Sequence, residues 1–256
     1  MVVLEEFGPS IWIANGPVVD FFGCPFPTRM AIIQLEDRSS WVWSPVKLTD
    51  ELKEDLKMRG IDNIKHVVSP NAIHHVFLKE WQDFFPKAKF YAPPGLRKRK
   101  IVKEVRFDRD IDDCTMIPKE ESNSRAGDDV AYTKEIFQVV VKGSFLLDEV
   151  IFFHPKSKTA IVADLIQQFQ EDQAHGWWKG LLKMDGLFGP SPTTPRALRL
   201  SFMFGKEQTR KVRDVILNDW KPENLILAHA ECVVDGRASE VISNAFSWLD
   251  KFHDCC

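Results

Sequence analysis

The segment Val67-Val68-Ser69-Pro70-Asn71-Ala72-Ile73-His74-His75 places two adjacent histidines directly after an apolar run. Neighbouring side chains point about 100° apart on a helix and to opposite faces of a strand, so two neighbours can share a ligand only where the chain bends. Ser69-Pro70-Asn71 supplies such a bend. The pair is therefore a candidate metal site, and a chance pair at a helix N-terminus is the simpler alternative.

The two histidines belong to a predicted strand, helix, strand unit. Residues 64–68 form a short apolar strand pattern, and residues 90–92 form another. Between them, residues 74–85 carry Phe77 and Trp81 at helical spacing. Open α/β sheets place their sites in loops at the carboxyl ends of strands, where this pair is expected. A helix N-terminus beneath the pair would also disfavour protonation of both imidazoles.

The rest of the chain continues this α/β pattern. Further strands are predicted at residues 11–14, 30–35, 41–43, 135–141, 149–153, 159–163 and 225–228. Further helices are predicted at residues 49–59, 177–182, 195–204, 206–218 and 239–252. A polar loop is expected around residues 119–130. At 256 residues, a single α/β domain covering 1–256 is the simplest organisation.

The composition excludes several classes of partner. With 34 basic and 37 acidic residues, the charge balance indicates neither nucleic-acid binding nor binding to an anionic membrane, so a small-molecule substrate or a protein partner is expected. The basic run at residues 97–100 fits a solvated loop. The first ten residues include two acidic side chains and do not resemble a secretory signal, and no apolar stretch reaches transmembrane length. We expect a cytoplasmic protein, and the sequence does not indicate its oligomeric state.

The five cysteines form neither an even framework nor a CxxC pair, so reduced thiols are expected. The ending Cys255-Cys256 is similar to the prenylated ending of some small GTPases, but it lacks their basic tail. Lipidation is therefore the less favoured interpretation of this pair.

Three predicted strand ends carry side chains that bind metals. His74 and His75 follow the strand at 64–68, Asp164 follows the strand at 159–163, and His229 follows the strand at 225–228. Each residue has an ordinary structural explanation, because an Asp after a strand is often a turn residue and a lone His is often structural. Together, four nitrogen and oxygen ligands suit zinc, iron or manganese.

In this order the residues resemble those of the metallo-β-lactamase superfamily, whose members carry a ThrHisXHisXAspHis motif, a middle His, a bridging Asp and a last His. Ile161-Val162-Ala163-Asp164 matches the bridging Asp, and Ile226-Leu227-Ala228-His229 matches the last His. The resemblance implies a four-layer αββα sandwich of two mixed β-sheets flanked by helices.

The family site holds two metal ions, and the positions at which this sequence departs from the family pattern are all ligands of the same ion. Pro70 and Ala72 occupy the positions of the first two histidines, and no His lies near residues 141–144, where the middle His is expected. His74 stands at the Asp position of the motif and His75 keeps its final His. The resemblance thus implies one divalent metal ion held by a surviving set of ligands, with zinc preferred over iron or manganese. That set is His74, His75, Asp164 and His229.

Three short segments also resemble an uncharacterised branch of this superfamily known only as a domain of unknown function. They are Trp-Ser-Pro-Val, Ser-Pro-Asn-XX-His-His and Ala-Pro-Pro-Gly-Leu. The resemblance covers roughly residues 11–248 by its order of elements, and it implies no particular substrate.

The function that follows is a mononuclear metal-dependent hydrolase of an ester, thioester, amide or phosphoester. Asp164 would be the catalytic residue, either as a metal ligand or as the general base. Four protein ligands close a tetrahedral ion, so catalysis requires a fifth position or one loosely held ligand. The alternative is a catalytically inactive member of the fold that binds a ligand or a partner. Iron-dependent redox chemistry is a third option.

Other side chains have both a functional and a structural interpretation. Glu149 would orient a ligating His or is a strand-edge charge, and Asn71 is an oxyanion donor or, preferably, a helix cap. Arg196 and Arg199 would bind an anionic group or lie on a surface helix. Trp177-Trp178 is more typical of packing than of a stacking platform.

Overall fold

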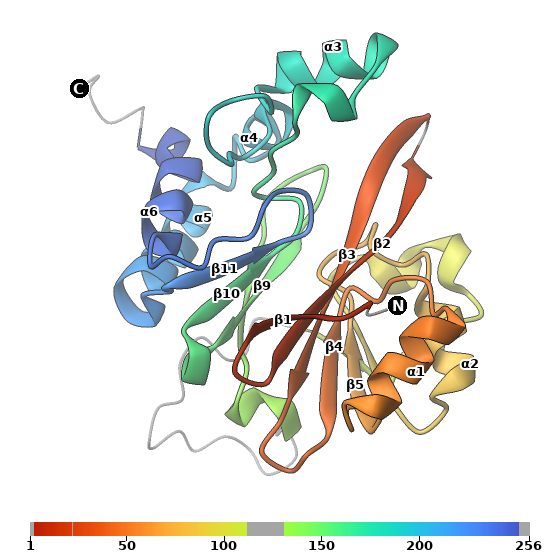
Figure 1. Ribbon diagram of the computed structural model, residues 1–256. Helices are drawn as coiled ribbons and strands as arrows, with labels where there is room; N and C mark the ends of the chain where they lie inside the picture. Colours follow the sequence, from red (N-terminus) through yellow and green to blue (C-terminus); the bar gives the residue numbers. More distant parts are fainter. Residues whose placement is uncertain (1–2, 22, 112–130, 251–256) are drawn as a thin grey trace. The chain divides into compact units, whose positions relative to one another are not determined.

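The computed structural model describes residues 3–21, 23–111 and 131–250 (Figure 1). Contacts between the described residues divide them into two compact units, the first ending at residue 111 and including 131–135, and the second formed by residues 136–250. Each unit has its own sheet and its own core. The expected polar loop around 119–130 and the pair Cys255-Cys256 lie outside the described residues. The single domain covering 1–256 stays a prediction.

The first unit contains a seven-stranded mixed sheet with the strands in chain order. Its strands are β1 (Glu5–Gly8), β2 (Ile11–Phe21), β3 (Cys24–Gln34), β4 (Ser40–Trp43), β5 (Ile64–Val68), β6 (Lys89–Ala92) and β7 (Arg109–Asp110). Strands β1 to β4 pair antiparallel, and β4 to β7 pair parallel. The parallel pairing brings the carboxyl ends of β4 and β5 to one edge of the sheet.

Two helices connect the parallel strands of this unit. Helix α1 (Asp50–Met58) begins after Thr49, whose hydroxyl accepts a hydrogen bond from the amide of Leu52. Helix α2 (Leu78–Phe84) buries Trp81, and the short 3-10 turns η1 (Leu96–Lys98), η2 (Lys100–Val102) and η3 (Ala131–Lys134) complete the unit. Apolar residues of both helices and of the sheet form one buried cluster.

The helix predicted at 74–85 is wrong at its beginning, because α2 starts only at Leu78. Polar side chains form hydrogen bonds with the backbone of the residues before Leu78. The Asn71 Oδ1 accepts hydrogen bonds from the amides of Ile73 and His74, and the Ser69 hydroxyl donates to the carbonyl of His74. Both histidines therefore lie in a hydrogen-bonded loop rather than on a helix.

The second unit contains a four-stranded mixed sheet in the order β11-β10-β9-β8. Its strands are β8 (Phe137–Val141), β9 (Glu149–His154), β10 (Thr159–Val162) and β11 (Asn224–Leu227). Its helices are α3 (Gly176–Asp185), α4 (Arg196–Ser201), α5 (Lys206–Val215) and α6 (Ala238–Ala245). Shorter turns are η4 (Pro155–Ser157), η5 (Glu171–Gln173), the π-helical η6 (Ile216–Trp220) and η7 (Ser247–Leu249). The helices predicted at 195–204 and 239–252 are thus shorter than expected.

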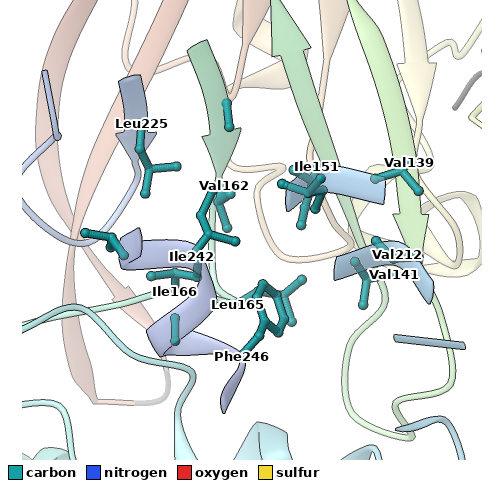
Figure 2. Packing of buried hydrophobic residues seen from close by; sticks show 14 of the residues in the cluster. Val139, Val141, Ile151, Val162, Leu165, Ile166, Val212, Leu225, Ile242 and Phe246 are labelled. Atoms are coloured by element: carbon teal, nitrogen blue, oxygen red, sulfur yellow. The ribbon is translucent and has the colours of Figure 1, made fainter. Parts of the chain in front are cut away.

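Alternating residues of this sheet pack against α5 and α6. Figure 2 shows Val139, Ile151 and Val162 of the sheet in one buried cluster with Val212 and Ile242 of the helices. Strands β10 and β11 pair parallel, and each ends two residues before a predicted metal ligand. The two strand ends consequently meet at one edge of the sheet.

Two buried histidines that are not predicted metal ligands, His66 and His154, should make the stability of the protein depend on pH. Burial, aided by Lys89, lowers the pKa of His66 to about 4, and burial, aided by Lys156, lowers the pKa of His154 to about 4. Between pH 4 and the ordinary pKa of about 6.5, the unfolded chain binds more protons than the folded chain. The free energy of unfolding should be highest above about pH 6.5 and fall as the pH decreases toward 4.

Urea denaturation across this pH range measures the effect. A double variant His66→Gln and His154→Gln should have a shallower pH dependence than the wild type, whereas the exposed control His175→Gln should keep the wild-type slope. An unchanged slope in the double variant would contradict the assignment.

Gly143 and Gly205 are in backbone contact in the second unit. A Cβ added to Gly143 would lie 2.8 Å from the Cα of Gly205, and Gly143 has a φ of 101°, which side chains rarely adopt. Gly143→Ala should therefore lower the free energy of unfolding by about 1–3 kcal/mol. Gly189→Ala is the control, since its Cβ would meet no atom closer than 3.8 Å. Equal stabilities of the two variants in chemical denaturation would refute this expectation.

Candidate functional site

His74 and His75 lie in the first unit, in the loop that follows β5. The ring Nδ1 of His74 is 2.7 Å from the hydroxyl of Ser44, at the end of the neighbouring strand β4. Ser44 is held there by a hydrogen bond from its amide to the carbonyl of Val68, and its φ of 48° lies in the left-handed region. When Nδ1–H donates to this hydroxyl, the Nε2 of His74 presents a lone pair.

His75 is half-buried and favours the neutral form. Its pKa is lowered by burial first, and then by the positive charge of Arg99 and by His74. The expected direction is confirmed, but the expected cause is different, because no helix begins at this position. A neutral imidazole remains available as a ligand near neutral pH.

Arg99 belongs to the basic run at residues 97–100, which the sequence predicts to be a solvated loop. In the structure it contacts the loop that carries His74 and His75. Its Nη1 donates a hydrogen bond of 3.0 Å to the carbonyl of Ala72. The guanidinium is therefore a structural cation of the loop that carries His74 and His75.

Asp164 lies in the second unit, two residues after β10, and its backbone is fixed by Glu149. The two carboxylate oxygens of Glu149 accept hydrogen bonds of 2.8 Å from the amide of Ala163 and 2.7 Å from the amide of Asp164. Glu149 is fully buried, so its structural interpretation as a strand-edge charge is wrong. The contact that it makes orients the backbone at Asp164.

His229 faces the carboxylate of Asp164 in the same unit. The Nε2 of His229 is 3.3 Å from the Oδ1 of Asp164, and both side chains are buried. The Nε2 of Gln167 donates to this Oδ1 at 3.1 Å and to the carbonyl of Asp164 at 2.9 Å. The ring of Phe169 stacks on His229 with 6.5 Å between centroids. The second unit thus provides a fixed, buried pair of one nitrogen and one oxygen donor.

Several other predicted site residues have structural contacts. Arg196 donates to the carbonyl of Met184, and Arg199 donates to the carbonyl of Thr194, which favours their surface-helix interpretation. Trp178 is buried and meets Phe169 edge-on, whereas Trp177 is exposed. Asn71 supports its own loop rather than capping a helix.

Each unit therefore contributes a distinct part of the predicted donor set. The imidazole and carboxylate groups of this set are the ligands that divalent transition metals accept in proteins. Sequence reasoning missed three supporting side chains. Ser44 belongs to the Trp-Ser-Pro-Val segment, but Gln167 and Arg99 have no signal in the sequence that marks their role.

Solved structures that share this fold are metallo-β-lactamases. DIM-1 metallo-β-lactamase exposed to ceftazidime is 14% identical, with 97% of this chain and 96% of that chain covered and a TM-score of 0.58. The metallo-β-lactamase from Hirschia baltica is 13% identical, with 96% of each chain covered and a TM-score of 0.56. FIM-1 from Pseudomonas aeruginosa in the mono-zinc form is 10% identical, with 97% and 94% covered and a TM-score of 0.60.

The chain has the metallo-β-lactamase-like α/β fold, with two mixed sheets and their helices, and the predicted fold class is confirmed. Residues 11–177 match the family described as Domain of unknown function (DUF4336), and the chain belongs to that family. A comparison with curated proteins gave no significant match. Among the residues that the structure describes, no helix is long and apolar enough to cross a membrane.

The contacts of Glu149 predict the effect of replacing its carboxylate. Glu149→Gln puts an amide NH2 against one of two backbone N–H groups, so one buried hydrogen bond is lost. The free energy of unfolding should fall by about 1–3 kcal/mol. Amide exchange at Ala163 and Asp164 should accelerate, as measured by hydrogen exchange. The exposed control Glu54→Gln should change neither quantity, and slow exchange retained in Glu149→Gln would argue against the clamp.

Proposed function

We propose that the protein is a mononuclear metal-dependent hydrolase. In this proposal, His74, Asp164 and His229 hold one divalent ion, with His75 as a fourth and weaker ligand. Zinc is the preferred metal, as nitrogen and oxygen donors suit it and a protein of similar fold has been crystallised in a mono-zinc form. The substrate is an ester, thioester, amide or phosphoester.

The observation that carries the proposal is the buried pair of Asp164 and His229. The carboxylate Oδ1 of Asp164 lies 3.3 Å from the Nε2 of His229. Burying such a pair costs free energy unless a cation or a proton lies between the two atoms. Two hydrogen bonds fix the position of Asp164. Its backbone amide donates to Glu149, and its carboxylate accepts from Gln167. Such support around a donor pair is typical of metal ligands, whose geometry depends on the residues behind them.

Two features support one metal rather than two. The positions of Pro70 and Ala72 lack the imidazoles that the family resemblance expects for the other metal. In addition, Arg99 binds the carbonyl of Ala72, so a permanent cation already lies at this part of the loop. A second divalent ion there would be repelled by the guanidinium.

The weaker role of His75 addresses the problem of a closed coordination sphere. In this proposal His75 is the loosely held ligand that leaves one coordination position open, and burial first and then the charge of Arg99 lower its pKa and keep its imidazole neutral. A bound divalent ion supplies Lewis acidity toward a carbonyl or phosphoryl group. Within the chain, Ser44 orients the ring of His74, and Asp164 serves as a ligand or accepts a proton from the attacking water.

The second candidate is a member of the fold that binds a ligand without turnover. The loss of three family ligands, at Pro70, at Ala72 and near residues 141–144, favours it. Metal binding with no hydrolysis would select this alternative, because a retained ion does not require a retained reaction.

Metal content of the purified chain tests the proposal. Wild type, prepared without chelators, should contain about one equivalent, and His74→Ala, Asp164→Asn and His229→Ala should each contain less than about 0.2. His75→Ala should fall between these values. The exposed control His175→Ala should match the wild type.

Hydrolysis of a panel of ester, thioester, amide and phosphoester substrates forms the second stage. Turnover should decrease in proportion to metal content across the variants and return when zinc is added to the wild type after chelation. A wild type with less than about 0.2 equivalents would rule out the metal site. Metal without turnover of any substrate would leave the binding alternative.

A further inference from the structure

Helix α3 of the second unit (Figure 1) carries apolar side chains on two faces. Trp178 and Leu182 are buried. Three more apolar residues are exposed, and they follow one another at the helical spacing that places side chains on a shared face. They are Trp177, Leu181 and Met184, with exposed fractions of 60%, 43% and 73%. We call these three residues the α3 apolar stripe. Because folding leaves this stripe exposed, it is available to a ligand.

Gly180 lies on the same face, between the members of the α3 apolar stripe. Glycine inside a helix lowers its stability relative to alanine. A Cβ added to Gly180 would meet no atom of the described residues within 4 Å, so packing against them does not require glycine here. The missing side chain leaves an open notch beside Trp177, Leu181 and Met184. A slender, chain-like apolar group can lie in this notch against the helix backbone.

Consecutive ring contacts lead from the α3 apolar stripe to a predicted metal ligand of the same unit. The ring centroids of Trp177 and Trp178 are 6.5 Å apart. Trp178 meets Phe169 edge-on at 6.1 Å, and Phe169 stacks on His229 at 6.5 Å. The stripe therefore begins at the end of an aromatic row whose other end is the imidazole of His229.

Backbone hydrogen bonds fix α3 relative to His229. The amide of Gln168 donates to the carbonyl of His229 at 2.9 Å, and the amide of Phe169 donates at 2.9 Å to the carbonyl of Leu187, in the turn after α3. The side-chain Nε2 of Gln168 also donates to the carbonyl of Gly189 at 2.8 Å. The segment after Asp164 thus binds His229 on one side and the turn after α3 on the other, so the stripe keeps a constant distance from this imidazole.

We propose that the α3 apolar stripe binds the acyl chain of the substrate. The proposal rests on the proposed hydrolase function and names its substrate class, which is carboxylic esters, thioesters or amides with unbranched acyl chains of medium length. Binding sites for small molecules are lined mostly by apolar and aromatic side chains, with few polar groups for orientation. The stripe and its notch supply the apolar part, and the candidate metal ligands supply the polar part.

The surroundings of the stripe disfavour other occupants. Residues 171–196 contain three acidic and three basic residues, so this segment has no surplus charge to select an ionic group or an anionic bilayer. A stable interface with a second copy of the chain needs about 20–30 residues on each side, far more than the stripe provides. An acyl chain, by contrast, is covered by a few side chains.

Hydrolysis of para-nitrophenyl acetate, butyrate, hexanoate and octanoate by the zinc-loaded full chain tests the proposal. The value of kcat/KM should rise at least about tenfold from acetate to octanoate, because each methylene removed from water contributes up to about fourfold. The double variant Leu181→Asn and Met184→Asn should lower the ratio of the octanoate to the acetate value at least about fivefold. Met58→Asn is the matched control, since Met58 is 75% exposed in the first unit and should keep the wild-type ratio.

Gly180→Glu is a second variant that guards against misfolding. Glutamate favours helices more than glycine does, and its Cβ meets no described atom within 4 Å, so the fold should be retained. Its charge in the notch should lower the octanoate to acetate ratio as the double variant does. Circular dichroism and the thermal midpoint of each variant verify folding.

Calorimetric titration with octanoic acid and acetic acid separates this proposal from the hydrolase proposal, because it requires no turnover. Wild type should bind octanoate at least about tenfold more tightly than acetate, and both variants should lose most of this difference. Preferential octanoate binding without hydrolysis of any ester would contradict the hydrolase and leave the acyl site. Hydrolysis without a chain-length preference, or a preference that both variants retain, would overturn the acyl site and leave the hydrolase. A dimer that the double variant dissociates, with the preference retained, would identify a second copy instead.

Discussion

The carboxylate of Glu149 binds two successive backbone amides, and the geometry of the candidate site in the second unit depends on this contact. A buried carboxylate is stable only when its oxygens are hydrogen-bonded, and two N–H groups pointing the same way satisfy both oxygens. The chain leaving β10 is thereby held in one conformation at Asp164. With its backbone fixed in this way, Asp164 directs its carboxylate toward His229.

The first unit uses a comparable arrangement with weaker groups. Hydroxyl and amide side chains of Ser69 and Asn71 bind the backbone of the loop, and the Ser44 hydroxyl fixes the ring of His74. In both units, the predicted ligands follow parallel strands, whose carboxyl ends share an edge of their sheet. Loops at such edges can carry polar groups because the strands beneath them supply the apolar core.

Much of the fold could be predicted from the sequence, since strand patterns depend on local alternation and on β-branched residues. The strand at 64–68 has its predicted bounds, and the strands that lead to Asp164 and His229 end within one residue of their predicted positions. The prediction of a helix at 74–85 was wrong at its beginning. The apolar spacing is helical, but the side chains of Ser69 and Asn71 form hydrogen bonds with the backbone before Leu78 and hold it in a loop. Periodicity does not register such side-chain to backbone competition.

By itself the sequence determined the candidate ligands and the strand ends that carry them, because each depends on a few consecutive residues. Only the tertiary structure decided the roles of Glu149, Gln167 and Arg99. Glu149 reaches Asp164 across 15 positions of sequence, and Arg99 reaches Ala72 across 27. Such contacts are set by the register of paired strands and by the path of the loops, which no local pattern encodes. The physical reason is that burial, which turns a surface charge into a structural clamp, is a property of the packed chain.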